Sequence, residues 1–153
     1  RALWVAPAAE PAPAGPALDA ALWMWSEVQS GVATLAAPLV EAFVPQMLNY
    51  ESVGGVNFKK GCYPGQEIVA RTQYLGKVKR HLYRLHAEVP LSAGGELYSA
   101  AAPDQSCGMI IVGALSPTGG YEALAVLMES AADAGVHLGT LSGPSVKAAA
   151  VAG

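Results

Sequence analysis

The feature that most constrains the fold of this chain is a change in its hydrophobic pattern at Lys77. From there to residue 89, apolar and polar residues alternate, as expected for a strand that is buried on one face. The residues predicted to face inward are His81, Tyr83, Leu85, Ala87 and Val89. Leu82 is the exception to this alternation.

Further apolar runs follow, and Gly- and Pro-containing turns separate them. They lie at residues 96–99, 109–115, 121–128 and 136–141, and residues 116–120 have the composition of a hairpin loop. Several short strands of this kind predict a small antiparallel barrel or sandwich. After Gly143 the sequence is mostly Ala, Gly and Ser, so we expect a flexible tail over 143–153.

The part of the chain before this region predicts mainly helices. After a strand-like opening at residues 1–6 and an Ala/Pro-rich loop at 7–16, a helix is predicted over 16–30. Gly31 is its predicted C-terminal stop. Residues that share one face of this helix by their spacing are Leu18, Leu22 and Trp25. Residues 32–50 predict short helical and irregular pieces.

A second helix is predicted from Pro64 to Leu75, with Gly76 just beyond its end. Pro is favoured at the first helical position because its backbone lacks the N–H that would be unpaired there. The residues expected to form the buried stripe of this helix are Ile68, Thr72 and Leu75, with Arg71 pointing outward.

Composition predicts that part of the surface packs against another domain. Charged residues make up 14% of the 153 residues, against about 25% in typical domains. The chain also begins at Arg1 without Met or a signal peptide. We therefore expect the C-terminal part of a longer protein that packs on a missing N-terminal domain. No apolar stretch approaches the roughly 20 residues that a spanning helix needs, so no membrane partner is expected.

Basic residues are concentrated in one segment. Seven of the nine Lys and Arg residues lie between Lys59 and Arg84, where Glu67 is the only acid. The segment therefore carries a net charge of +6, while the rest of the chain carries −9. Such a segment fits an anionic partner: a polyanionic cofactor tail, RNA through residues 59–84, or an acidic protein face. A solvated surface with charges at helix ends fits it equally well.

A cysteine loop precedes the second predicted helix. It begins at Lys59 and Lys60 and continues through Gly61, Cys62, Tyr63 and Pro64 to Gly65, Gln66 and Glu67. A thiol near two ammonium groups and a helix N-terminus is favoured as the reactive thiolate. The alternative interpretation is an inert cysteine packed in a Gly/Pro turn.

The cysteine count also bounds the chemistry. Cys62 and Cys107 are the only two cysteines and form no CxxC pair, which favours a reducing compartment such as the cytoplasm. An iron–sulfur cluster usually needs four thiolates or close substitutes, so we expect no metal held by this chain alone. Cys107, at the head of an apolar run, is expected in the core.

The cysteine loop and its flanks resemble the YgfZ family of folate-binding proteins, bacterial relatives of the aminomethyltransferase (T-protein, GcvT) of glycine cleavage. The similar residues are 43–49 and 54–71, with the specific core Lys60-Gly61-Cys62-Tyr63 followed by Gly65-Gln66-Glu67. The resemblance implies a large N-terminal folate-binding region packed on a C-terminal β-barrel. It also implies a role in assembling or maintaining iron–sulfur clusters, including those of tRNA-modifying enzymes.

These observations together predict an α+β fold. Residues 1–76 would be the remnant of a GcvT-like folate-binding domain, containing a strand and helices, and 77–142 a small antiparallel C-terminal β-barrel. Tetrahydrofolate or a derivative is the cofactor that the resemblance implies, with most of its site upstream of Arg1.

The predicted function is that of an accessory protein rather than a turnover enzyme, with iron–sulfur enzymes or cluster-assembly proteins as partners. Cys62 would be the functional thiol. The supporting residues would be Lys59, Lys60, Gly61, Tyr63, Gly65, Gln66, Glu67 and Arg71. The alternatives are a folate-dependent aminomethyltransferase or other one-carbon transferase and, ranked last, an RNA-binding module.

Overall fold

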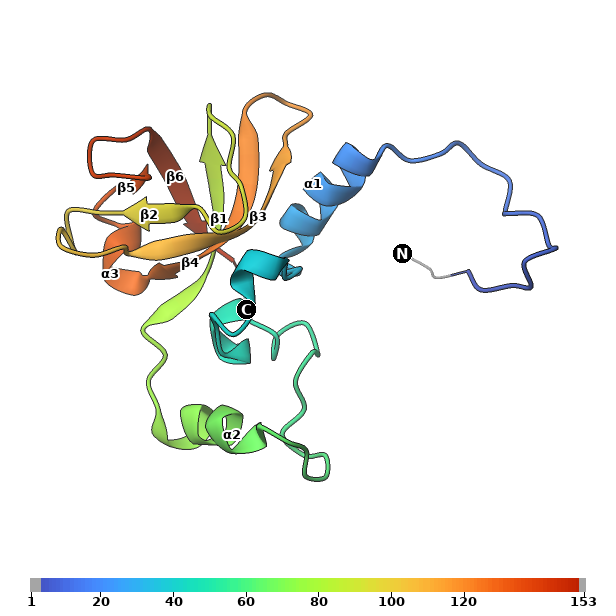
Figure 1. The fold of residues 1–153 in the computed structure, drawn as a ribbon, viewed down its shortest axis with the longest axis horizontal. Helices are drawn as coiled ribbons and strands as arrows, with labels where there is room; N and C mark the ends of the chain where they lie inside the picture. Colours follow the sequence, from blue (N-terminus) through green and yellow to red (C-terminus); the bar gives the residue numbers. More distant parts are fainter. Residues whose placement is uncertain (1–3, 152–153) are drawn as a thin grey trace.

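The computed structural model describes residues 4–151 and consists of a closed six-stranded antiparallel barrel with helices beside it (Figure 1). The elements in chain order are α1 (Ala20–Ser30), η1 (Ala37–Leu39), η2 (Pro45–Leu48), α2 (Gln66–Leu75), β1 (Arg80–Ala87), β2 (Glu96–Tyr98), β3 (Gly108–Leu115), β4 (Tyr121–Met128), α3 (Glu129–Ala132), β5 (Val136–Leu138) and β6 (Ser145–Ala150). The α+β class and the predicted barrel are confirmed, and the sandwich alternative is wrong.

The strands are ordered β1-β4-β3-β2-β5-β6 around the barrel, and β6 returns to β1 to close it. The pair β3–β4 is the predicted hairpin, in which Leu115 lies opposite Tyr121 across the loop at 116–120. Its register shifts once, between Ile110 and Val112. A closed barrel of this kind leaves no unpaired strand edge.

The prediction of a flexible tail from residue 143 is wrong for the residues that the structure describes. Residues 145–150 form β6, which pairs with β1 over four residue pairs and with β5 over two. Val146 is buried among the barrel core residues. A run of Ala and Ser lacks strand propensity, but pairing with two neighbours satisfies its backbone and overrides that preference.

Apolar residues form two clusters, one inside the barrel and one between its outer face and the helices. Leu85, Leu97 and Leu127 belong to the inner cluster. Leu82 and Leu124 pack instead with Val28 of α1, Leu39 of η1 and Leu48 of η2. The helical layer therefore covers the outer side of β1, β3 and β4, which explains why Leu82 breaks the predicted alternation.

Helix α1 begins later than the sequence predicts. It starts at Ala20 because the Asp19 side chain caps it, accepting a hydrogen bond of 2.7 Å from the Ala21 N–H. It ends at Gly31 as predicted, in the left-handed conformation with φ of 70°. The face that packs on the barrel is Met24, Trp25 and Val28. The predicted face is confirmed at Trp25 and wrong at the other two residues, because Leu18 precedes the helix and Leu22 is exposed.

Helix α2 runs from Gln66 to Leu75, so Pro64 lies in the turn before it rather than at its first position. Its end at Gly76 is confirmed. The predicted buried stripe is wrong: Ile68 and Leu75 are 64% and 84% exposed, and Val69 is the buried residue. The reason is that α2 packs on η2 and lies away from the barrel (Figure 1).

The predicted opening strand is not observed. Residues 4–6 are irregular, and residues 1–3 lie outside the described part of the chain. Residues 32–50 do contain the predicted short helices, η1 and η2. The domain division at residues 76 and 77 stays a prediction. Within residues 4–151, no helix has the length and apolar character needed to cross a membrane.

Candidate functional site at the cysteine loop

The cysteine loop is a non-repetitive segment that turns into α2. Residues 61–63 have no regular structure, and Pro64 and Gly65 form the turn before the helix. Gly65 has φ of 81°, a conformation that glycine adopts without steric cost. It occupies the N-cap position of α2, where no side chain provides a cap. The direction of the helix therefore depends on a glycine at this point.

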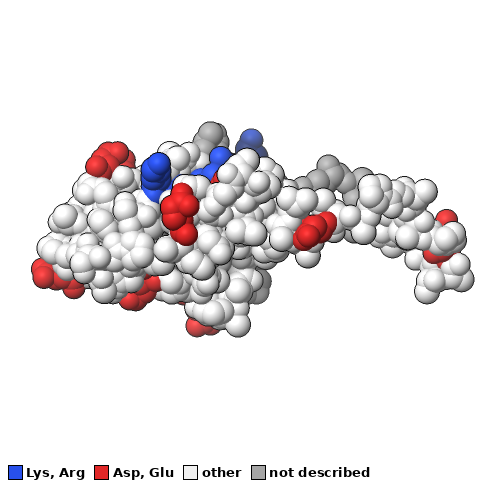
Figure 2. Space-filling model, turned by 90° about the horizontal axis from the view of Figure 1, so that it is seen from above, with Lys and Arg blue, Asp and Glu red and all other residues white. Residues whose placement is uncertain are grey.

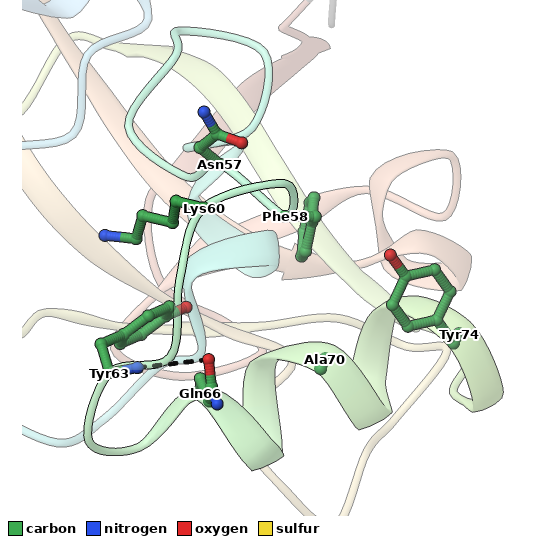
Figure 3. A pocket seen from close by; sticks show the side chains of 7 residues that line it. All are labelled: Asn57, Phe58, Lys60, Tyr63, Gln66, Ala70 and Tyr74. Carbon is green, nitrogen blue, oxygen red and sulfur yellow. Dashed lines mark hydrogen bonds between the residues drawn. The ribbon is translucent and has the colours of Figure 1, made fainter.

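Gln66 connects the start of α2 back to the loop. Its side-chain Oε1 accepts a hydrogen bond of 3.2 Å from the Tyr63 N–H, and its own N–H donates to the Tyr63 carbonyl oxygen at 3.3 Å (Figure 3). This reciprocal pair satisfies backbone groups that the helix itself cannot pair. Glu67 lies in the first turn of α2, where the helix dipole favours a negative charge.

Aromatic residues and a lysine surround a small cavity at this loop. The Lys60 ammonium lies 4.4 Å from the centroid of the Tyr63 ring, within the range of a cation–π interaction. Phe58 contacts Tyr74 of α2 edge to face, with centroids 6.3 Å apart. The cavity measures about 50 Å³, and Asn57, Gln66 and Ala70 complete its lining (Figure 3).

A buried glutamine attaches α2 to the preceding helical layer. Gln46 in η2 is 4% exposed, and its Nε2 donates to the Val69 carbonyl oxygen at 2.7 Å. Val69 is the buried residue of α2, so this bond lies at the centre of the contact between the two elements. The cysteine loop is thereby held beside η2 rather than beside the barrel.

The two cysteines have opposite environments. Both are free thiols, but Cys62 is exposed and Cys107 is buried. Burial raises the pKa of the Cys107 thiol, which keeps it in the neutral, unreactive form. The predicted core position of Cys107 is confirmed. Cys62 is accessible to a reagent or a partner, so the interpretation of it as a packed, buried cysteine is wrong.

Only some of the predicted site residues converge. Lys60, Tyr63 and Gln66 line the cavity, while Gly61 and Gly65 shape the loop around it. The remaining predicted residues, Lys59, Glu67 and Arg71, are exposed. Arg71 lies with Thr72 and Leu75 at a different surface hollow.

Sequence reasoning missed Phe58, Tyr74 and Gln46 as site residues. Phe58 and Tyr74 lie 16 positions apart and contact each other only because α2 turns back along the loop. The signal for Gln46 was its place within residues 43–49, which carry part of the family resemblance.

The basic segment does not form one continuous face. Lys59, Lys60, Arg71, Lys77 and Lys79 are exposed, but Arg84 is partly buried and directed toward α1. On the face that Figure 2 shows, charged side chains are few and scattered over a mainly uncharged surface. The exposed positive charges are therefore divided among the cysteine loop, α2 and the connection to β1.

Thiol labelling tests these opposite environments directly. We expect iodoacetamide to modify Cys62 in the folded protein and to modify Cys107 only after denaturation, because a buried thiol must be exposed before it reacts. Mass spectrometry of tryptic peptides before and after addition of urea would measure both. Labelling of Cys107 as fast as Cys62 under native conditions would contradict the burial of the Cys107 thiol.

Possible metal ligands are scattered. Among residues 4–151, no group of three or more His, Cys, Asp or Glu side chains is placed to hold a metal ion. Cys62 can therefore supply one thiolate to a metal or a cluster, and the other ligands would come from elsewhere.

Comparison with curated proteins gives one consistent result. Over 74 residues the chain is 45% identical to the "tRNA-modifying protein YgfZ" of Colwellia psychrerythraea, covering 48% of this chain and 23% of that protein. It is 42% identical over 67 residues to the protein of the same name from Edwardsiella ictaluri, covering 44% and 20%. The Aliivibrio fischeri protein of this name is 37% identical over 112 residues, covering 71% and 35%.

The chain thus spans between about a fifth and about a third of the length of these relatives. No protein-family model matches it.

Proposed function

Because this chain belongs to the YgfZ family, we propose that it is part of a protein that supports tRNA modification, with Cys62 as its functional thiol. The observation that carries this proposal is the exposed, free Cys62 on a loop that has fixed contacts on both sides. Gln66 binds the backbone of Tyr63 directly after the cysteine, and Lys60 contacts the Tyr63 ring. An exposed cysteine without a structural role in the core is suited to react with or to bind a partner.

We further propose that the protein acts through iron–sulfur clusters, as an accessory in their assembly or maintenance for tRNA-modifying enzymes. The cluster is cargo in this scheme. A cluster usually needs four protein ligands, and Cys62 offers one cysteine sulfur at the surface. Cys62 would therefore take part in a shared or transient contact with an iron–sulfur enzyme or an assembly protein, which supplies the other ligands.

Tetrahydrofolate or a derivative is the cofactor that we propose for the complete protein. The cavity at the cysteine loop does not fit a folate, because its volume of about 50 Å³ lies far below the roughly 300–1,000 Å³ of organic ligand sites. We therefore assign folate binding mainly to the part of the family's polypeptide that this chain does not span.

The exposed apolar side chains of α2 are the surface that we propose for contact with that remaining polypeptide. Ile68, Tyr74 and Leu75 are 64%, 71% and 84% exposed. Burying such side chains on another domain stabilises the contact by roughly 1.5–3 kcal/mol for each fully buried large residue. The chain covers at most 35% of the length of the three relatives compared above, so the family contains enough further polypeptide to cover this face.

We place the protein in a reducing compartment, the cytoplasm. The support is the state of its thiols: Cys62 and Cys107 are both free, and free exposed cysteines persist where the thiol pool is reduced.

Replacing Cys62 in the complete protein tests the proposed function. We expect Cys62→Ala to lower the level of tRNA modifications made by iron–sulfur enzymes, because the variant lacks the thiolate but keeps the loop contacts of Tyr63 and Gln66. Mass spectrometry of digested tRNA from cells that carry only the variant would measure the modified nucleosides. Cys107→Ala is the matched control, since it removes the buried thiol, and it should leave the modification level near that of the unmodified protein.

Unchanged tRNA modification in the Cys62→Ala strain would remove the thiol from the mechanism. Turnover of a methylene- or formyl-folate by the complete protein would instead support the one-carbon transferase alternative. The described residues offer no histidine or carboxylate in the lining of the cysteine-loop cavity that could serve such a reaction as a general base.

A further inference from the structure

A second site lies on the outer face of the barrel, away from the cysteine loop. It is a hollow of about 340 Å³ between the C-terminal end of α1 and strands β1, β4 and β6. The residues that line it include Gln29, Arg84, His86, Glu122, Lys147 and Ala149. None of them belongs to the family motif around Cys62.

The strand register explains why polar groups meet there. His86 of β1 lies opposite Lys147 of β6 on one side and opposite Glu122 of β4 on the other. These three side chains therefore form one row across three strands, with neighbouring Cβ atoms about 5 Å apart. Arg84 is two residues from His86 on the same strand, so both point to the same face.

The hollow exists because β6 carries small side chains beside Arg84. Ala149 lies opposite Arg84 in the register, and its methyl group leaves space that a larger residue would fill. The Ala-rich sequence that suggested a flexible tail thus opens a depression on the barrel surface.

Arg84 is held in place but is not fully paired. Its Nη2 donates a hydrogen bond of 2.7 Å to the Gln29 carbonyl oxygen in the last turn of α1, where the helix dipole favours a cation. Its Nε is buried and has no hydrogen-bond partner. A buried donor without a partner is costly, and a guanidinium presents its donors in a planar array that matches an oxyanion. The guanidinium therefore has hydrogen-bonding capacity that the protein leaves unused, and Arg84 lines the hollow where an oxyanion would use it.

Glu122 is occupied by neutral donors. Its Oε1 accepts a hydrogen bond of 3.3 Å from the Ser116 hydroxyl, and its Oε2 accepts one from the Gln29 side-chain amide. His86, another lining residue, has its Nε2 3.5 Å from Glu88 Oε1. The lining thus contains two permanent cations, Arg84 and Lys147, and one carboxylate that other groups already engage.

We propose that this hollow binds a small organic oxyanion, a phosphate monoester or a carboxylate. Arg84 binds the anion with its guanidinium, and Lys147 provides the second charge from the neighbouring strand. The volume lies at the lower end of the range for sites that hold organic ligands, which matches a compact ligand. This site is separate from the function proposed for Cys62, and either can fail without the other.

Binding of simple anions to the full chain tests the proposal. Inorganic phosphate and succinate would serve as probes in separate titrations followed by two-dimensional NMR at constant ionic strength. We expect saturable shifts at the Arg84 Nε–H and at residues 147–149. Tighter binding of phosphate would indicate a phosphate site, and tighter binding of succinate would indicate a carboxylate site.

Three single substitutions then distinguish a specific anion-binding site from nonspecific electrostatic attraction of the probe to the protein. Lys147→Gln should weaken binding about tenfold or more, because it removes one charged donor from the ligand. Glu122→Gln should strengthen binding, since the nearby negative charge is lost while the shape is kept. Lys77→Gln is the matched control, because it removes the same charge outside the hollow and should change the affinity little.

The proposal is wrong if neither probe produces saturable shifts at the hollow. It is equally wrong if Lys147→Gln and Lys77→Gln weaken binding to the same extent, because the attraction would then depend on net charge alone. Arg84→Lys adds an independent test: it keeps the charge but lacks the Nε–H donor, and it should still lose affinity. Lys147 is exposed and Glu122 is only partly buried, so their variants should fold. The NMR spectrum of each variant should therefore show the dispersion of the folded parent, which is the required control.

Discussion

The Gly113→Ala variant is expected to lose about 3 kcal/mol of its free energy of unfolding, the upper end of the usual cost of overpacking. A Cβ atom built at Gly113 would lie 1.8 Å from the carbonyl oxygen of Leu91 and 2.8 Å from its carbonyl carbon. These atoms belong to backbone that passes over β3, so no change of rotamer can relieve the overlap. Leu91 is itself 4% exposed and packs in the inner core. The backbone would have to move together with a core side chain.

Urea denaturation followed by circular dichroism would measure this effect, and Gly61→Ala is the matched control. Gly61 has nothing within 4 Å of its built Cβ, so its variant should retain the stability of the parent. An equal transition midpoint for Gly113→Ala and the parent chain would show that the 90–91 segment does not approach β3 as described.

Removal of residues 145–153 is expected to abolish cooperative folding of the barrel. The deletion opens the ring between β1 and β5 and removes six residue pairs of the strand register. It also removes Val146 from the inner core, where it is 4% exposed. The lost burial and the two newly unpaired strand edges together should cost several kcal/mol, a large share of the roughly 5–15 kcal/mol that stabilises a domain.

Thermal unfolding of the shortened chain would show this as a broad transition at a much lower temperature. Val146→Ala in the full chain is a milder version of the same test, and we expect it to lower the free energy of unfolding by about 1–3 kcal/mol. A shortened chain that unfolds at the same temperature as the parent would restore the interpretation of this segment as a flexible tail.

Local pattern was sufficient for the strands that carry strong side-chain signals. The β3–β4 hairpin was predictable because two apolar runs flank a loop with Pro and two Gly residues. The ends of α1 and α2 at Gly31 and Gly76 were predictable because glycine terminates helices. Their starts were not, since a proline within reach of each start suggested a first helical position that the chain does not use.

The faces of the helices could not be predicted from spacing. In α2, the period of apolar residues identified Ile68 and Leu75 as buried, yet the structure buries Val69 beside Gln46. Spacing states which residues share a face, but which face is covered depends on the neighbour. The same holds for Leu82, whose burial depends on the helical layer outside the barrel.

By itself, the sequence determined the α+β class, the series of short strands and the motif of the cysteine loop, and its strand pattern left a barrel or a sandwich open. Each of these depends on residues close together in the chain: alternation, turn residues, and the motif around Cys62. The tertiary structure alone decided that Cys62 is exposed, that residues 145–150 close the barrel, and that Arg84 meets Lys147 and Glu122 beside α1. Those outcomes depend on which distant segments pack together, because burial and cross-strand register are properties of the folded chain and not of local composition.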